Sequence, residues 1–133
     1  MKSTGIIVPS IIWLARAGFL ACSAVILWLA LDRQSFILIS GFYDLDKLNH
    51  VFAFVTLALL LDYSFPFTER FWRKWLPLLC FGVAIELLQL MSGYRYFEWG
   101  DIFADASGLA VYLLIRPRFR PALDKRLGLS TES

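Results

Sequence analysis

Long apolar blocks separated by short polar links make up most of the chain. Four such blocks cover about residues 11–31, 48–65, 75–92 and 99–115. Apolar residues fill these blocks continuously instead of recurring with the period of a strand or of an amphipathic helix, as helices surrounded by lipid require. The pattern predicts an all-α integral membrane protein that forms a bundle of four transmembrane helices.

The ends of the blocks follow from prolines and charged residues. Pro66 closes the second block, because proline has no backbone N–H with which to continue a helical ladder. The fourth block reaches the roughly 20 residues of a membrane span only if Asp101 and Asp105 lie within it. We expect one membrane domain over residues 1–133, in which the polar and basic residues 117–133 form a loose cytoplasmic tail.

The composition agrees with a membrane protein. Hydrophobic residues make up 59% and charged residues 18% of the 133 residues, and the mean hydropathy is +0.63. An ordinary soluble domain is less apolar. The net charge of +2 is too small to indicate a nucleic-acid partner, and we expect none.

The two cysteines indicate no metal or redox site. Cys22 and Cys80 lie inside apolar blocks, without a CxxC pair or a zinc-binding spacing. Cys22 could be the lipidated residue of a lipoprotein signal, but the apolar run continues past it to Leu31, as in a spanning helix. We therefore expect two inert, buried thiols.

The basic residues predict the orientation of the bundle. Lysine and arginine in short links tend to remain on the cytoplasmic side of a membrane. We therefore expect both termini in the cytoplasm of a bacterium, and we interpret the basic link between the second and third blocks only as a topology signal and a phospholipid contact. The residues concerned are Lys2 and Arg16, then Arg70, Arg73 and Lys74, then Arg116, Arg118, Arg120, Lys125 and Arg126.

The remaining polar residues gather at the other ends of the blocks, where they would meet at one face of the membrane. Ionisable groups inside spanning segments are costly, so such a cluster indicates a functional site. Pairs three or four positions apart also share one helical face. The cluster consists of Asp46, Lys47 and His50 at the second block, Glu86 and Gln89 at the third, Arg95 in the next link, and Asp101 and Asp105 at the fourth.

These residues, in this order and spacing, resemble the VanZ-like family of small bacterial membrane proteins. The resemblance covers about residues 44–115 and includes Gly108. The chain departs from the family pattern at Asp105, where Asn is more frequent, and at Tyr112, where a second Gly is common. The resemblance implies a multi-pass helical protein of the inner membrane whose polar cluster is the functional site. The founding member is associated with teicoplanin resistance, a role that we do not transfer to this chain.

The roles of the polar residues can be assigned by their chemistry. Glu86, His50 and Asp101 are the candidate catalytic residues, since a general acid or base needs a pKa that burial can tune. A structural alternative is that Glu86 forms an ion pair with Lys47 or Arg95 and ties the helix ends together. The candidate substrate-binding residues are Asp46, Lys47, Gln89, Arg95 and Asp105.

Three hypotheses about function remain at this stage. The site could recognise or modify a lipid-linked or anionic component of the cell envelope, which leaves open whether the protein is an enzyme. It could instead belong to a non-catalytic module that binds membrane lipids or scaffolds an envelope partner protein. A metal site is the weakest hypothesis, because one histidine next to a lysine and an arginine makes a poor cage for a cation. We expect neither a metal nor a cofactor.

Overall fold

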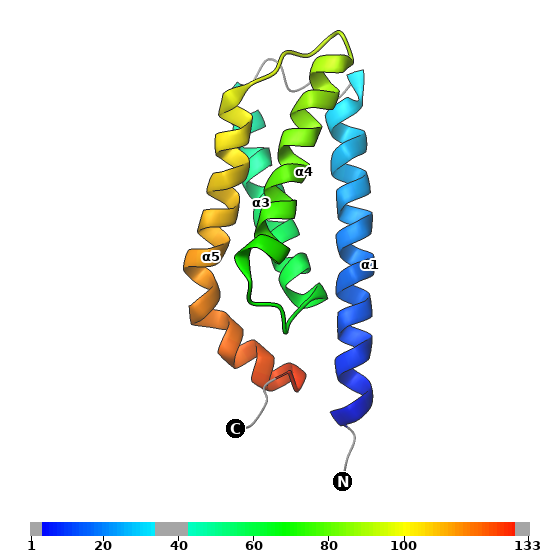
Figure 1. The fold of residues 1–133 in the computed structure, drawn as a ribbon, viewed down its shortest axis with the longest axis vertical. Helices are drawn as coiled ribbons and strands as arrows, with labels where there is room; N and C mark the ends of the chain where they lie inside the picture. The colour runs from blue at the N-terminus through cyan, green and yellow to red at the C-terminus, as the bar shows by residue number, and fades with distance from the viewer. Residues whose placement is uncertain (1–3, 34–42, 130–133) are drawn as a thin grey trace.

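The computed structural model describes residues 4–33 and 43–129, which form a bundle of long helices that run up and down (Figure 1). Their order is α1 (Thr4–Leu31), α3 (Tyr43–Ser64), α4 (Phe71–Met91) and α5 (Trp99–Leu127). The start of α1 and the end of α5 lie at one end of the bundle, which we call the termini end. We call the opposite end, where residues 92–98 join α4 to α5, the link end.

The core of the bundle lies around α3, which packs against α1, α4 and α5. Apolar side chains of α3 recur every three or four residues and meet bulky residues of α4 and α5. The buried members are Phe54, Leu57, Ala58 and Leu61 of α3, Trp75 and Leu78 of α4, and Leu109 and Tyr112 of α5. Burial of this apolar surface fixes the faces that the four helices turn toward one another.

Two glycines allow close contacts between helices, because small residues at helix crossings let the backbones approach each other. A Cβ atom on Gly108 would lie 2.5 Å from the backbone oxygen of Val51, so α5 approaches the α3 backbone there. A Cβ atom on Gly82 would lie 2.5 Å from Asp105 Oδ2 and 2.9 Å from the ring of Phe54.

Two of the four helices are long and apolar enough to cross a membrane, namely Pro9–Leu31 within α1 and Phe71–Met91, which is α4. Large apolar side chains are widely exposed on the bundle, including Trp13, Leu20 and Leu114. Exposure on this scale is expected of a surface that lipid covers. The chain therefore has the properties of a membrane protein, whereas the prediction of four spans with both termini in the cytoplasm stays a prediction.

The predicted loose tail is wrong over residues 117–127, because α5 continues through Pro117 and Pro121 and ends at Leu127. Gly128 closes the helix with φ 70°. Figure 1 shows this part of α5 bending toward α1. Leu123 and Leu127 pack there against a small cluster formed by Ala15, Tyr63 and Leu129. Apolar contact thus stabilises a segment whose sequence reads as polar, while residues 130–133 of the predicted tail, and Lys2, lie outside the described residues.

Two smaller expectations also need correction. The third block is expected to begin at about residue 75, but α4 begins at Phe71, which places Pro77 inside the helix. Cys22 is half-buried and Cys80 is exposed, so the expected burial of both thiols is wrong for Cys80. A position on an apolar helix does not distinguish the protein interior from the outer surface of the bundle, because both are apolar in a membrane protein.

Candidate functional site

The polar residues singled out in the sequence come together at the link end of the bundle. The first turns of α3 supply Asp46, Lys47 and His50, and the last turns of α4 supply Glu86 and Gln89. Arg95 lies in the link, and the first turns of α5 supply the two aspartates, Asp101 and Asp105. Four of these side chains, those of Glu86, Gln89, Asp101 and Asp105, are buried.

His50 is held between two carboxylates of α5. Its Nδ1 atom lies 2.8 Å from Asp105 Oδ1, and its Nε2 atom lies 3.8 Å from Asp101 Oδ2. When Asp105 is ionised it can only accept hydrogen bonds, and the contact then places a proton on Nδ1. Nε2 is then the second nitrogen, and it faces Asp101.

Lys47 connects α3 to the start of α5. Its Nζ atom donates to Asp101 Oδ1 at 2.9 Å and to Glu98 Oε2 at 3.1 Å. Gly100 makes room for this side chain, since a Cβ atom there would lie 2.8 Å from Nζ. Glu98 was not among the predicted residues, although an acidic residue directly before a helix is a recognisable helix-start signal.

Glu86 is not paired as expected. Its Oε2 atom accepts the backbone N–H of Glu98 at 3.2 Å, and its Oε1 atom is buried without a hydrogen-bond partner. Among the residues that the structure describes, no ion pair joins Glu86 to Lys47 or Arg95. The alternative that Glu86 forms such an ion pair is therefore wrong, because Lys47 and Arg95 lie against aspartates instead.

Arg95 lies between α3 and α1. Its guanidinium is 3.5 Å from Asp46 Oδ2 and donates to the backbone oxygen of Ala30 at 3.4 Å. The same carbonyl accepts the side-chain amide of Gln89 at 3.1 Å. Tyr94, also in the link, donates its hydroxyl to the carbonyl of Leu31. The end of α1 is thus bound by polar side chains from the end of α4 and from the link that follows it.

A cavity of about 410 Å³ opens beside these residues, between α1, α3 and α4. This volume is within the range of small-molecule sites. Its polar side chains gather at the link end, while the rest of the wall is apolar. The polar lining residues are Asp46, Asn49, His50, Gln89 and Arg95, and the apolar ones are Ile26, Leu29, Ala30, Ala53, Phe54 and Ile85.

A family model described as VanZ/LLP1 matches residues 10–120. The chain belongs to the VanZ/LLP1 family. The match begins within α1, so the family region is longer than the 44–115 that the polar motif indicates. No curated protein and no solved structure matches the chain.

In this VanZ/LLP1 protein, one group of side chains could be arranged around a metal ion. Ligand atoms of Asp46, His50 and Asp101 all lie within 4.8 Å of one another. Two of the three carry a cation already, since Arg95 lies against Asp46 and Lys47 donates to Asp101. A metal ion would have to compete with Lys47 and Arg95 for these carboxylates. The three side chains therefore fit ion pairs with lysine and arginine better than they fit a metal site.

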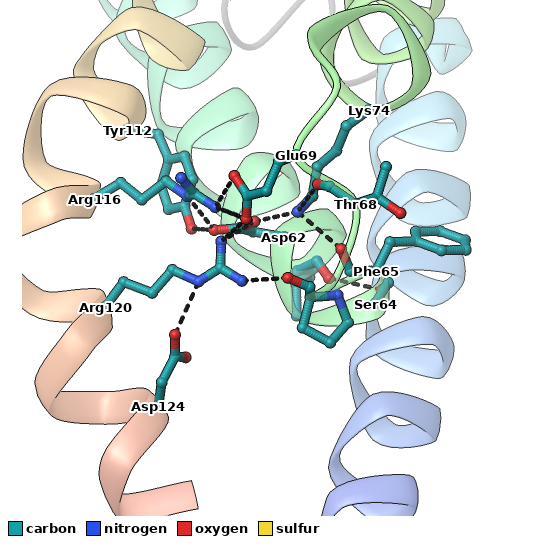
Figure 2. Close-up of polar contacts among 12 residues, drawn as sticks. Asp62, Ser64, Phe65, Thr68, Glu69, Lys74, Tyr112, Arg116, Arg120 and Asp124 are labelled. Atoms are coloured by element: carbon teal, nitrogen blue, oxygen red, sulfur yellow. Dashed lines mark hydrogen bonds and ion pairs between the residues drawn. The ribbon is translucent and has the colours of Figure 1, made fainter. Parts of the chain in front are cut away.

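A second polar cluster, at the termini end, was not predicted. Figure 2 shows Lys74, Tyr112, Arg116 and Arg120 converging on Asp62 of α3, which is completely buried. The signal for it was present, because Asp62 interrupts an apolar block. The interpretation of Lys74 as only a topology signal is wrong, since this side chain is buried and donates to Asp62.

Tyr112 explains one departure from the family pattern. It occupies the position where a second glycine is common, and its hydroxyl donates to Asp62 Oδ2 at 2.7 Å. Its ring also packs against Trp75 and Phe119. A glycine at this position would lack both the core contact and the hydrogen bond, so this chain uses the position to join α5 to α3.

Proposed function

We propose that this VanZ/LLP1 protein crosses the bacterial inner membrane four times, with the termini end in the cytoplasm and the link end facing outward. Arg70 of the α3–α4 link and Arg73 of the first turn of α4 lie at the termini end, where the positive-inside rule would keep them in the cytoplasm. Each helix is at least 21 residues long, which at 1.5 Å per residue spans the roughly 30 Å hydrocarbon core. The partly charged helices α3 and α5 would cross with their polar residues turned into the bundle.

The cavity at the link end carries the proposal about function. One part of its wall is apolar and includes Ile26 and Leu29, and the other part presents Arg95, His50 and Gln89. A ligand complementary to both parts has an apolar chain and a polar or anionic head group. The protein therefore recognises or modifies a lipid-linked or anionic component of the cell envelope.

The polar residues have different roles in this proposal. Arg95 lines the cavity, and its planar guanidinium suits a phosphate or carboxylate head group. Lys47 does not appear in the cavity wall and instead fixes Asp101 and Glu98, so it positions the start of α5. His50 lines the cavity with Asp105 behind it, an arrangement that suits proton transfer to or from the head group.

A non-catalytic binding or scaffold module is the second candidate. One observation favours this second candidate. Of the three catalytic candidates, all of them among the described residues, His50 lines the cavity, whereas Glu86 and Asp101 lie behind its wall. A binding protein needs the cavity and Arg95 but no proton transfer. The two candidates differ in what His50 does for the ligand.

Mass spectrometry of lipid that copurifies with the native protein tests the proposal. We expect a lipid with an anionic head group in the wild type and in Arg118→Gln, and a smaller amount of it in Arg95→Gln. Arg118 is a matched control because it is exposed and donates to its own helix at Leu114. If His50→Gln retains the lipid but abolishes the envelope phenotype, the protein is an enzyme. If the lipid is unaffected by Arg95→Gln, the proposed site is wrong.

A further inference from the structure

The cluster at the termini end holds more cations than its buried carboxylate can neutralise. Asp62 accepts hydrogen bonds from Arg116 Nε at 2.7 Å and from Arg120 Nη1 at 2.9 Å. It also accepts one from Lys74 (Figure 2). Three positive charges thus surround one buried negative charge, and the half-buried Asp124, which pairs with Arg120, supplies a second. Buried charges are stable only when they are paired, so the two arginines need a further anion on their outer side.

Glu69 supplies that anion in this structure. It belongs to the link between α3 and α4, and its carboxylate accepts from Arg116 Nη2 at 3.1 and 3.3 Å and from Arg120 Nη1 at 3.4 Å. Its side chain is 66% exposed. Ion pairs exposed to this degree are weak, because water solvates both partners well. The carboxylate is therefore held loosely in front of two guanidinium groups that Asp62 holds firmly from behind.

A cavity of about 520 Å³ lies in front of the same two arginines. Its wall includes Glu69, Arg116 and Arg120, together with Phe67 and Pro121. Arg120 is oriented further by Asp124, whose Oδ2 accepts from Nε at 3.2 Å, and by the carbonyl of Pro66, which accepts from Nη2 at 2.7 Å. The guanidinium groups are thus fixed before any ligand arrives, which lowers the entropic cost of binding one.

We propose that Arg116 and Arg120 form a binding site for a phosphate-bearing anion at the termini end, and that Glu69 occupies this site as a displaceable internal ligand. Guanidinium groups bind phosphate oxygens through paired N–H donors, as they bind a carboxylate. Exchange of the Glu69 carboxylate for a phosphate keeps an anion in front of the two guanidinium groups. The inference is independent of the function proposed for the link end, which involves other residues at the other end of the bundle.

The phosphate group could belong to a lipid head group or to a small soluble molecule, and both present the same chemistry to the arginines. Calorimetry with inorganic phosphate on the detergent-purified protein measures the soluble form. Binding of the protein in phosphatidylcholine discs with and without added phosphatidylglycerol measures the lipid form. Both are carried out at low ionic strength, because salt screens exposed charges.

Glu69→Gln is the decisive variant, because it removes the internal ligand from an exposed position and should fold normally. We expect the anion to bind about two- to fivefold more tightly, which corresponds to the loss of one exposed ion pair. Arg116→Gln and Arg120→Gln should each weaken binding by about tenfold or more, as loss of a charged hydrogen bond does. Arg118→Gln removes the same charge from the same helix without touching the site, and should change affinity less than about twofold.

The outcomes separate the sources and test the site. Binding of inorganic phosphate assigns a soluble ligand, and binding that requires phosphatidylglycerol assigns a lipid head group. The same measurements on Arg95→Gln should be unchanged, which distinguishes this site from the one at the link end. If Glu69→Gln binds neither probe more tightly than the wild type, or if Arg118→Gln is as damaging as Arg116→Gln, the inference is wrong. Should the arginine variants fail to fold, Glu69→Gln alone decides.

Discussion

The imidazole of His50 and the carboxylate of Asp105, 2.8 Å apart, join α3 to α5 beside the cavity of the link end. Asp105 is also the position where the related sequences more often carry Asn. An asparagine can still accept the Nδ1 proton, but it has no negative charge to stabilise a protonated imidazole. Asp105 can therefore act in two ways: its hydrogen bond positions the His50 ring, and its negative charge stabilises the protonated form of that ring.

Substitutions at Asp105 should separate these two roles. We expect Asp105→Asn to lower the free energy of unfolding by less than about 1 kcal/mol, because the hydrogen bond is retained. Asp105→Ala should cost about 1–3 kcal/mol, since it leaves the His50 ring without its partner. Denaturant unfolding in detergent measures both. Equal losses for the two variants would contradict a positioning role.

The second prediction concerns the buried charges at the termini end. Asp62→Asn should destabilise the bundle by about 3–5 kcal/mol, because three cations lose the carboxylate that neutralises them. Asp124→Asn removes a carboxylate that pairs with Arg120 alone among the described residues, and should cost less than about 1 kcal/mol. Thermal unfolding of the two variants provides the comparison. Similar melting temperatures would show that Asp62 is not the centre of this cluster.

A third prediction tests the ion pairs of the link end with double-mutant cycles. Lys47→Met and Asp101→Asn should be coupled by about 1 kcal/mol or more, since their side chains are 2.9 Å apart and Asp101 is buried. Glu86→Gln should be nearly neutral for stability, because glutamine can still accept the N–H of Glu98. Additive losses for the first pair, or a coupling of Glu86 to Lys47 of similar size, would contradict the observed pairing.

The fourth prediction concerns the crossing of α3 and α5. Gly108→Ala should destabilise the protein by about 1–3 kcal/mol, because the new methyl group would overlap the Val51 carbonyl. Ala110→Ser, two residues further on an exposed face of the same helix, serves as the control and should have little effect. Stability of the two variants in detergent checks the prediction. A Gly108→Ala protein as stable as the control would mean that the helices are further apart.

Much of the fold could be predicted because apolar blocks and their breaks are local properties of the sequence. The eight polar residues of the link end could be placed together because helices of similar length must return to the same face. Their pairing could not be predicted, since the choice of Lys47 between Glu86 and Asp101 depends on helix rotation and on the space left by Gly100. The cluster around Asp62 was missed because Lys74 and Arg116 lie among basic residues that topology alone explains.

The predicted membrane topology can be tested with reporter fusions. A reporter active only outside the cytoplasm should give signal near Gly93, in the link between α4 and α5. One active only in the cytoplasm should give signal at the C-terminus and near Glu69. The reason is that arginines and lysines of the termini end resist translocation. The reverse pattern would place the cavity with His50 and Arg95 on the cytoplasmic side and contradict an envelope ligand.

The central claim is that the link-end cavity binds a molecule with an apolar chain and an anionic head group, and dodecyl phosphate binding tests it most directly. The wild type and the Arg118→Gln control should bind dodecyl phosphate more tightly than dodecanol. Arg95→Gln, made in an Arg116→Gln background so that the phosphate site proposed for the termini end does not contribute, should remove that preference. Ala53→Phe, which fills the apolar part of the cavity, should weaken binding of both by about tenfold. Wild-type affinity for dodecyl phosphate in both variants would show that the cavity is not the site.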